Sequence, residues 1–257
     1  MKKSLQLSLF LTGMVSLPAM AHPDYKNLGT FSGLSVGASG SVNTSVHSNY
    51  GWADAADADW GDSHNGQFLQ FTLENPAAVK LSVESNMTPN EAGGVLLPGF
   101  SVYEGLAVPL AHDFADAAFA WRDMQAGPAA DEGFWNAMGS FQTANDAGET
   151  SFLTFKGYAV DGTAANFGSA TTQPGVMGDG TADGTVNKIF SLDAGTYSVI
   201  VGGAEYDAVG TAAGSRNYDF GASIAVVPEP ETYAMLLAGL GLMGAVARRH
   251  KAADKAA

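Results

Sequence analysis

The chain has 257 residues, of which 46% are hydrophobic and only 15% charged, with 32 Gly and no Cys. This length allows one large domain with its own core, and the lack of Cys excludes disulfides, thiol catalysis and Cys-ligated zinc. The net charge is −14, and residues 22–227 alone hold 23 acidic and 6 basic residues, an excess of 17 negative charges. Phosphate backbones are therefore repelled, and no nucleic-acid partner is expected.

The chain opens with the three parts of a secretory signal peptide. Two lysines precede an apolar run, and Ala19 and Ala21 then form a small-x-small cleavage site before His22. We expect signal peptidase to remove residues 1–21, so that the body is exported. The alternative is an uncleaved anchor.

An acidic stretch, GWADAADADWGDSH, lies near the start of the body and contains Asp54, Asp57, Asp59 and Asp62. Carboxylates this close repel one another unless water, a cation or a ligand relieves the charge. Oxygen ligands close together suit Ca²⁺, although the spacing is not that of an EF-hand. Two interpretations therefore stay open: a solvated acidic loop and a Ca²⁺ site.

Residues 22–226 are predicted to form one secreted, mainly β domain. Short segments in which apolar and polar residues alternate indicate strands at 67–74, 78–84, 99–105, 151–160, 187–192, 196–203 and 218–226. Many Gly turns and no Cys favour an antiparallel β-sandwich of jelly-roll-like form. Residues 35–48 are either an edge strand or a mobile lead-in.

Two pairs of these segments are predicted to form hairpins. In the first, Leu69, Phe71 and Leu73 share one face, and a short Asn-Pro turn leads to the next strand. In the second, a tight Asp-Ala-Gly turn is expected to need the backbone freedom of Gly195. The stretches FLQFTLENPAAVKLSVES and NKIFSLDAGTYSVIVGG resemble the opening and closing strands of bacterial pre-peptidase C-terminal domains, which implies a small secreted sandwich.

A long insertion, at about residues 106–150, departs from that compact domain. HDFADAAFAWRDM within it predicts one short helix, and the Gly- and Pro-rich remainder is expected to be loop. Aromatic residues gather in or beside the predicted loops: Trp52, Trp60, Trp121, Phe134 and Trp135. Their rings either stack on sugar faces or cover the core of the sandwich.

Motifs for catalysis or metal binding are sparse. GDGTADGT places Asp179, Thr181, Asp183 and Gly184 at positions 1, 3, 5 and 6 of a Ca²⁺-loop-like pattern, but the twelfth position is Phe190. This segment is either a Ca²⁺ candidate or a plain turn. The five His are scattered, and neither G-x-S-x-G nor H-E-x-x-H occurs, so we expect no enzyme and no obligatory cofactor.

Residues 227–257 form a distinct tail. Pro228, Glu229 and Pro230 precede a hydrophobic helix predicted at 233–247, and Arg248 and Arg249 follow it. The uncharged run 232–247 would be about 24 Å long as a helix, against about 30 Å for a bilayer core, so it suits a transient anchor with its basic end inside.

This order of parts resembles the PEP-CTERM sorting signal of exported proteins in Gram-negative bacteria. The resemblance implies recognition by an exosortase, cleavage near the motif, delivery to the cell surface or matrix, and association with exopolysaccharide or biofilm. An ordinary short C-terminal anchor is the alternative. We therefore expect a structural or adhesive matrix protein. A carbohydrate- or Ca²⁺-binding module is the second hypothesis and a matrix-polymer hydrolase the third.

Overall fold

The computed structural model describes residues 23–52, 60–61, 65–86, 94–111, 135–164, 167, 176–205, 216–228, 238–240 and 242–243. Its strands are β1 (Lys26–Phe31), β2 (Ser39–Val46), β3 (Trp60–Gly61), β4 (Gln67–Leu73), β5 (Ala77–Ser85), β6 (Pro98–Glu104), β7 (Trp135–Asn136), β8 (Phe141–Ala144), β9 (Thr150–Val160), β10 (Thr185–Leu192), β11 (Gly195–Gly203) and β12 (Tyr218–Val227). The predicted strands are therefore confirmed, and residues 39–46 form a strand at a sheet edge.

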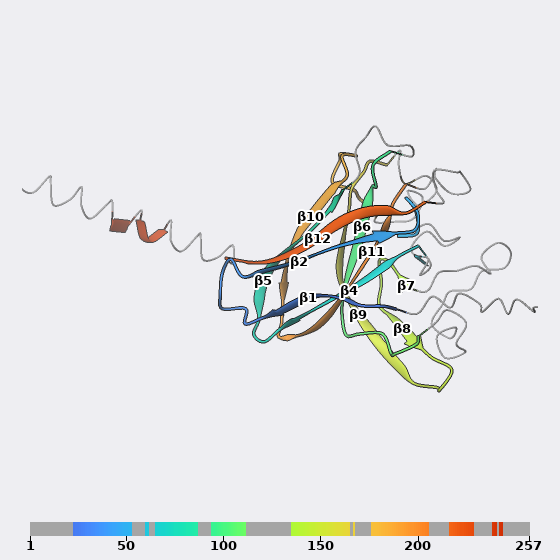
Figure 1. Ribbon diagram of the computed structural model, residues 1–257. Coiled ribbons are helices and arrows are strands. Elements are labelled where there is room, and N and C mark those ends of the chain that lie inside the picture. The colour runs from blue at the N-terminus through green and yellow to red at the C-terminus, as the bar shows by residue number, and fades with distance from the viewer. Residues whose placement is uncertain are drawn as a thin grey trace, which may run out of the picture.

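Two sheets face each other in the sandwich (Figure 1). The larger sheet has the order β1-β4-β11-β6-β9-β8, and the smaller has the order β10-β5-β12-β2. The mainly β sandwich is thus as predicted, with one difference: β1 pairs with β4 in parallel, so the larger sheet is mixed. The short strands β3 and β7 form a separate ribbon.

Both predicted hairpins are wrong. Strand β4 pairs with β1 and β11, whereas β5 pairs with β10 and β12 in the other sheet. The Asn-Pro and Asp-Ala-Gly connections therefore cross from one sheet to the other. Gly195 begins β11 and is not among the glycines with positive φ, so that connection does not depend on the conformational freedom of glycine.

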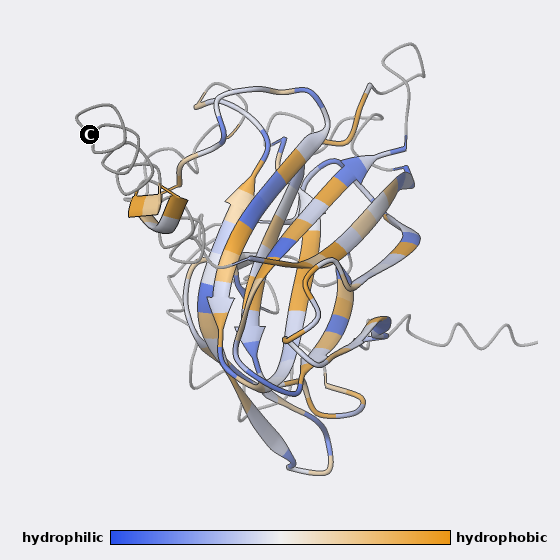
Figure 2. Cartoon of the chain, turned by 90° about the vertical axis from the view of Figure 1, so that its left-hand side faces the viewer, coloured by the Kyte–Doolittle hydropathy of each residue, from blue (hydrophilic) through white to orange (hydrophobic). Residues whose placement is uncertain are grey.

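The main core lies between the sheets, where alternate residues of each strand meet. Leu69, Phe71 and Leu73 from β4 pack there, as their predicted common face requires. The Phe71 and Tyr197 rings stack with their centroids 5.1 Å apart. Figure 2 shows hydrophobic and hydrophilic residues alternating along the strands.

A second core covers the outer face of the larger sheet. Phe68 and Ile200, whose neighbours along the strands face the main core, pack here with Tyr103, Trp52 and Trp135. Strand β6 is consequently buried on both faces from Pro98 to Tyr103. The smaller sheet differs, because its outward positions are half-buried or exposed and many of them, such as Ser41, Asn43 and Ser223, are polar.

The region predicted as a loop insertion contains structure that the sequence did not reveal. Strands β7 and β8 both lie within 106–150, and β8 pairs with β9 at the edge of the larger sheet. Phe141 and Thr143 alternate inward along β8, but four residues are too few for a clear pattern. The predicted helix near residue 112 lies outside the described residues.

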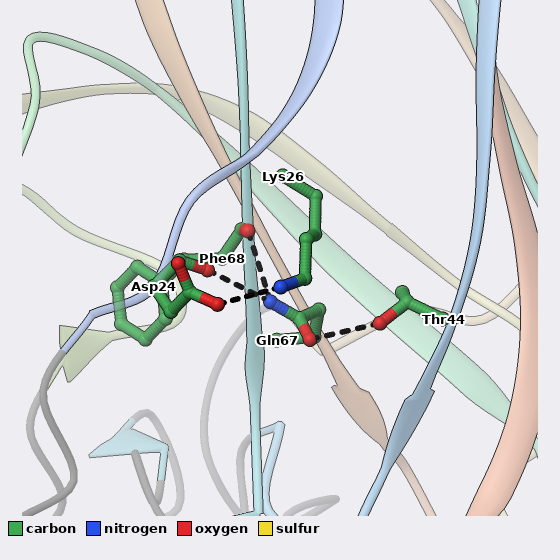
Figure 3. Close-up of polar contacts among 5 residues, drawn as sticks. All are labelled: Asp24, Lys26, Thr44, Gln67 and Phe68. Atoms are coloured by element: carbon green, nitrogen blue, oxygen red, sulfur yellow. Dashed lines mark hydrogen bonds and ion pairs between the residues drawn. The ribbon is translucent and has the colours of Figure 1, made fainter.

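The Gln67 side chain connects the two sheets (Figure 3). The Thr44 hydroxyl on β2 donates to Gln67 Oε1 on β4 at 3.0 Å. Gln67 Nε2 in turn donates to the main-chain oxygens of Asp24, at 3.0 Å, and Phe68, at 3.1 Å. One amide thus connects β2, β4 and the segment that leads into β1.

Candidate functional site

The outer face of the smaller sheet contains a polar hollow of ≈ 230 Å³. Its lining comes from all four strands of that sheet and the residue after β5: Ser41, Val42, Asn43, Ser82, Glu84, Asn86, Thr185, Gly221, Ala222 and Ser223. The strand registers place Asn43, Gly221, Glu84 and Thr185 side by side in one row. Hydroxyl and amide groups dominate this lining, so it offers both hydrogen-bond donors and acceptors.

Sequence patterns did not single out this hollow. Its residues are ordinary outward-facing positions on four different strands, and only the register brings them together. The one available signal was Gly221, which interrupts the alternating segment YDFGASIAV where a side chain would be expected.

The Ca²⁺-loop-like segment forms a turn whose carboxylates bind the backbone. Asp179 Oδ1 accepts from Thr181 N at 3.0 Å and from the Thr181 hydroxyl at 3.1 Å. Asp183 Oδ1 accepts from Thr185 N at 3.0 Å. Among the described residues no three His, Asp or Glu side chains are grouped to hold a metal, so Ca²⁺ binding by Asp179 and Asp183 stays a prediction.

A buried carboxylate that the sequence did not indicate lies beneath this turn. Asp161 is fully buried and accepts from Gly184 N at 2.7 Å and from Asp183 N at 3.3 Å. Burial raises the pKa of Asp161 from 3.8 to about 6, the two backbone hydrogen bonds oppose that rise, and the charges of Asp179 and Asp183 add to it. The carboxyl joins the end of β9 to the start of β10.

Two of the aromatic residues considered for sugar stacking are core residues. Trp52 is 1% exposed and Trp135 is 0% exposed, so neither ring is available to a ligand. Trp52 lies against Gly99, and its Nε1 donates to the Ser101 hydroxyl at 3.0 Å. Trp135 Nε1 is buried without a hydrogen-bond partner among the described residues.

Several predicted site residues lie outside the described residues. These are the signal-peptide positions Ala19, Ala21 and His22, the acidic positions Asp54, Asp57, Asp59 and Asp62, the aromatic positions Trp121 and Phe134, and the tail positions Glu229, Pro230, Arg248 and Arg249. For Trp60 only the backbone is described, in its pairing with Asn136.

The tail begins where the sandwich ends. Strand β12 runs to Val227, Val226 N donates to Ala38 O at 2.9 Å, and Pro228 follows. Ala238, Gly239, Leu240, Leu242 and Met243 are helical, within the predicted helix. In the part of the chain that the structure describes, no helix has the length and apolar character required to cross a membrane.

A family model, described as the PEP-CTERM protein-sorting motif, matches residues 226–251. The chain carries a PEP-CTERM sorting motif. The motif confirms the resemblance drawn from Pro228, Glu229 and Pro230, marks the chain for sorting to the cell exterior, and implies processing by an exosortase. It overlaps the sandwich only at the last two residues of β12.

Comparison of the whole chain with curated proteins gives no significant match. Among solved structures, the chain is similar to CorA, a surface-associated copper-binding protein important in copper acquisition by Methylomicrobium album BG8. The TM-score is 0.50 and the identity 14%, over 79% of this chain and 100% of that chain. This likeness supports the fold.

Two further solved structures are more distant. Mercury-soaked MopE, a secreted protein of Methylococcus capsulatus in which an oxidised tryptophan facilitates copper binding, gives a TM-score of 0.43 and 17% identity, over 77% of this chain and 86% of that chain. The pre-peptidase C-terminal domain of a Bacillus anthracis collagenase, the domain type that the strand patterns resemble, gives 0.30 and 8%, over 79% and 95%.

Proposed function

We propose that this exported protein is a non-enzymatic component of the cell surface or extracellular matrix and associates there with exopolysaccharide. The PEP-CTERM motif at residues 226–251 is the observation that carries the proposal. Its position after the last strand allows the tail to be removed near the motif while β12 keeps its pairing with β5 and β2. Signal peptidase and exosortase are the processing partners, and the C-terminal helix is a transient inner-membrane anchor.

The surface of the sandwich is suited to such a role. The outer face of the smaller sheet is polar, and its strands carry Ser, Asn and Thr side chains that can exchange hydrogen bonds with a hydrated polymer. The body is also strongly acidic, which opposes binding to other polyanions.

Fractionation of the native host tests this proposal. We compare the full chain with a variant that ends at Val227, and expect the full chain in the surface and matrix fractions and the variant in the medium. Co-purification of the full chain with host exopolysaccharide is expected as well. An identical distribution of the two chains, or no polysaccharide in the purified material, would contradict the proposal.

Copper binding is a second candidate, favoured by the likeness to CorA at a TM-score of 0.50. Imidazole and thioether groups suit copper, and residues 22–230, the expected mature chain, hold four His and four Met but no Cys. Titration of the mature protein with Cu²⁺ and with Cu⁺ should give saturable binding. Titration with Ca²⁺ tests the acidic loops in the same way, by a rise in melting temperature.

A further inference from the structure

Gly221 is an unusual residue for its place in the fold. It lies in the middle of β12 and pairs with Asn43 on one side and Glu84 on the other, in a register that continues unbroken in both directions. It is not among the glycines with positive φ, so the backbone there does not require glycine. A glycine inside a strand weakens the strand, and it marks either a bulge or a place where another group approaches closely. The regular register excludes a bulge.

The missing side chain opens the polar hollow. A Cβ atom at Gly221 would lie 3.2 Å from Asn43 Oδ1 and 3.7 Å from Asn86 Oδ1, and these are the described atoms within 4 Å of it. Any larger side chain would therefore occupy the space between Asn43, Asn86 and Glu84. Glycine keeps that space open and leaves the backbone of β12 as its floor.

The lining indicates the chemistry of the occupant. In the row beside Gly221, Ser223 lies between Ser41 and Ser82. These hydroxyls both donate and accept, while Asn86 Nδ2 donates to Asn43 Oδ1 at 3.3 Å and holds the two amides together. Glu84 contributes the one ionised side chain of the described lining, and a carboxylate only accepts hydrogen bonds.

A ligand for this hollow must therefore carry several hydroxyl donors and no negative charge. Phosphate and uronate groups would face Glu84 directly, inside the field of a chain with net charge −14. A neutral sugar satisfies both conditions, because two adjacent hydroxyls of one ring can donate to the two oxygens of Glu84.

We infer that the hollow around Gly221, with Asn43, Glu84 and Thr185 beside it, binds a sugar unit of a neutral polysaccharide. This inference rests on the proposed association with exopolysaccharide and names the surface that makes it. The adjacent row of hydroxyls, Ser41, Ser223 and Ser82, would contact the neighbouring unit of the same polymer chain.

Gly221→Val tests whether the open space at this position is required for binding. Valine favours strands and its side chain fills the hollow, although its Cβ would lie 3.2 Å from Asn43 Oδ1, so Asn43 must shift slightly. The urea midpoint of each variant, measured beside the binding assay, shows whether it is folded. Ala225→Val is the matched control, because Ala225 faces outward on the same strand but does not line the hollow. Glu84→Gln keeps the shape and removes the charge that accepts from a diol.

The assay measures retention of the mature protein, purified from its host, on immobilised host exopolysaccharide, with neutral glucan, neutral galactomannan and anionic alginate as further probes. We expect Gly221→Val to weaken retention on the host polymer at least about tenfold, Ala225→Val to match the wild type, and neutral probes to be favoured over alginate.

Equal retention of Gly221→Val and the wild type would overturn the inference while leaving the proposed function in place. A wild-type protein that host exopolysaccharide does not retain would overturn the proposed function and the inference together. A preference for alginate would overturn the assignment to neutral sugars.

Discussion

Asn49 holds together three segments that are far apart in the chain. Its side chain is 1% exposed, and its Nδ2 donates to Val95 O at 3.0 Å and to Glu205 Oε2 at 2.8 Å. Its Oδ1 accepts from Leu97 N at 2.7 Å. Such a buried amide stabilises the fold mainly because its removal would leave neighbouring polar groups without a hydrogen-bond partner.

Asn49→Ala should therefore lower the free energy of unfolding by about 2–3 kcal/mol, because it leaves the buried Leu97 N without an acceptor and removes the donor to the half-buried Val95 O. Urea denaturation measures this loss. Asn187→Ala is the control, since Asn187 is exposed on β10, and should change stability by less than about 0.5 kcal/mol. Equal effects of the two substitutions would contradict the role given to Asn49.

Asp161 gives the fold a pH dependence with a definite sign. Its pKa in the folded chain is about 6, above its ordinary value of 3.8, so between these values the folded state binds more protons than the unfolded state. Its favourable contribution is therefore complete below about pH 4 and is lost as the pH rises through about 6.

The difference between wild type and Asp161→Asn isolates this contribution. The variant has no titratable group at that position, so its urea midpoint should change less than that of the wild type between pH 4 and pH 6.5. Parallel pH profiles for the two proteins would contradict the raised pKa.

The alternation of apolar and polar residues predicted the strands but could not assign them to one sheet or the other. Leu69, Phe71 and Leu73 were correctly placed on one face of β4, and Val79, Leu81 and Val83 of β5 enter the same core. Two strands that line one core from opposite sheets have the same pattern as two strands paired in a hairpin. The short connections therefore suggested pairing where the chain instead crosses between layers.

The polar hollow could not be predicted from the sequence, because it depends on which strands are paired and in which register. Alternation predicts that Asn43, Glu84 and Thr185 face outward, but their neighbours across the sheet depend on register, which one sequence does not define. The sorting motif of the tail could be predicted because Pro228, Glu229 and Pro230 are contiguous in the sequence and do not depend on strand pairing.

The hydrogen bonds of the Gln67 side chain should hold β1 and β2 in place. Gln67→Ala removes the bond to Thr44 and the bond to Asp24 O, so β1 and β2 should loosen together. We expect a loss of about 1–2 kcal/mol and faster amide hydrogen exchange in β1 and β2 than in β6. Gln70→Ala on the same strand is the control, since the bonds to Thr44 and to Asp24 O are made by Gln67, and Gln70 is likewise half-buried. Unchanged exchange in β1 and β2 would refute the bridging role.

At the scale of the whole molecule, the two faces of the sandwich differ in what covers them. The larger sheet lies between two cores, whereas the outward side of the smaller sheet has no second core among the described residues and carries many polar side chains. The tail leaves from β12, which belongs to the smaller sheet. A chain cut after this strand keeps both cores and the hollow, so processing and binding are compatible.

Intact-mass spectrometry of the protein recovered from the surface of its own host tests the central claim, that a complete sandwich is exported and then freed of its terminal segments. We predict a chain that starts at His22 and ends near Pro230, without the apolar run and Arg248–Arg249. A full-length chain of 26.4 kDa recovered from the cytosol, with both apolar segments attached, would contradict it.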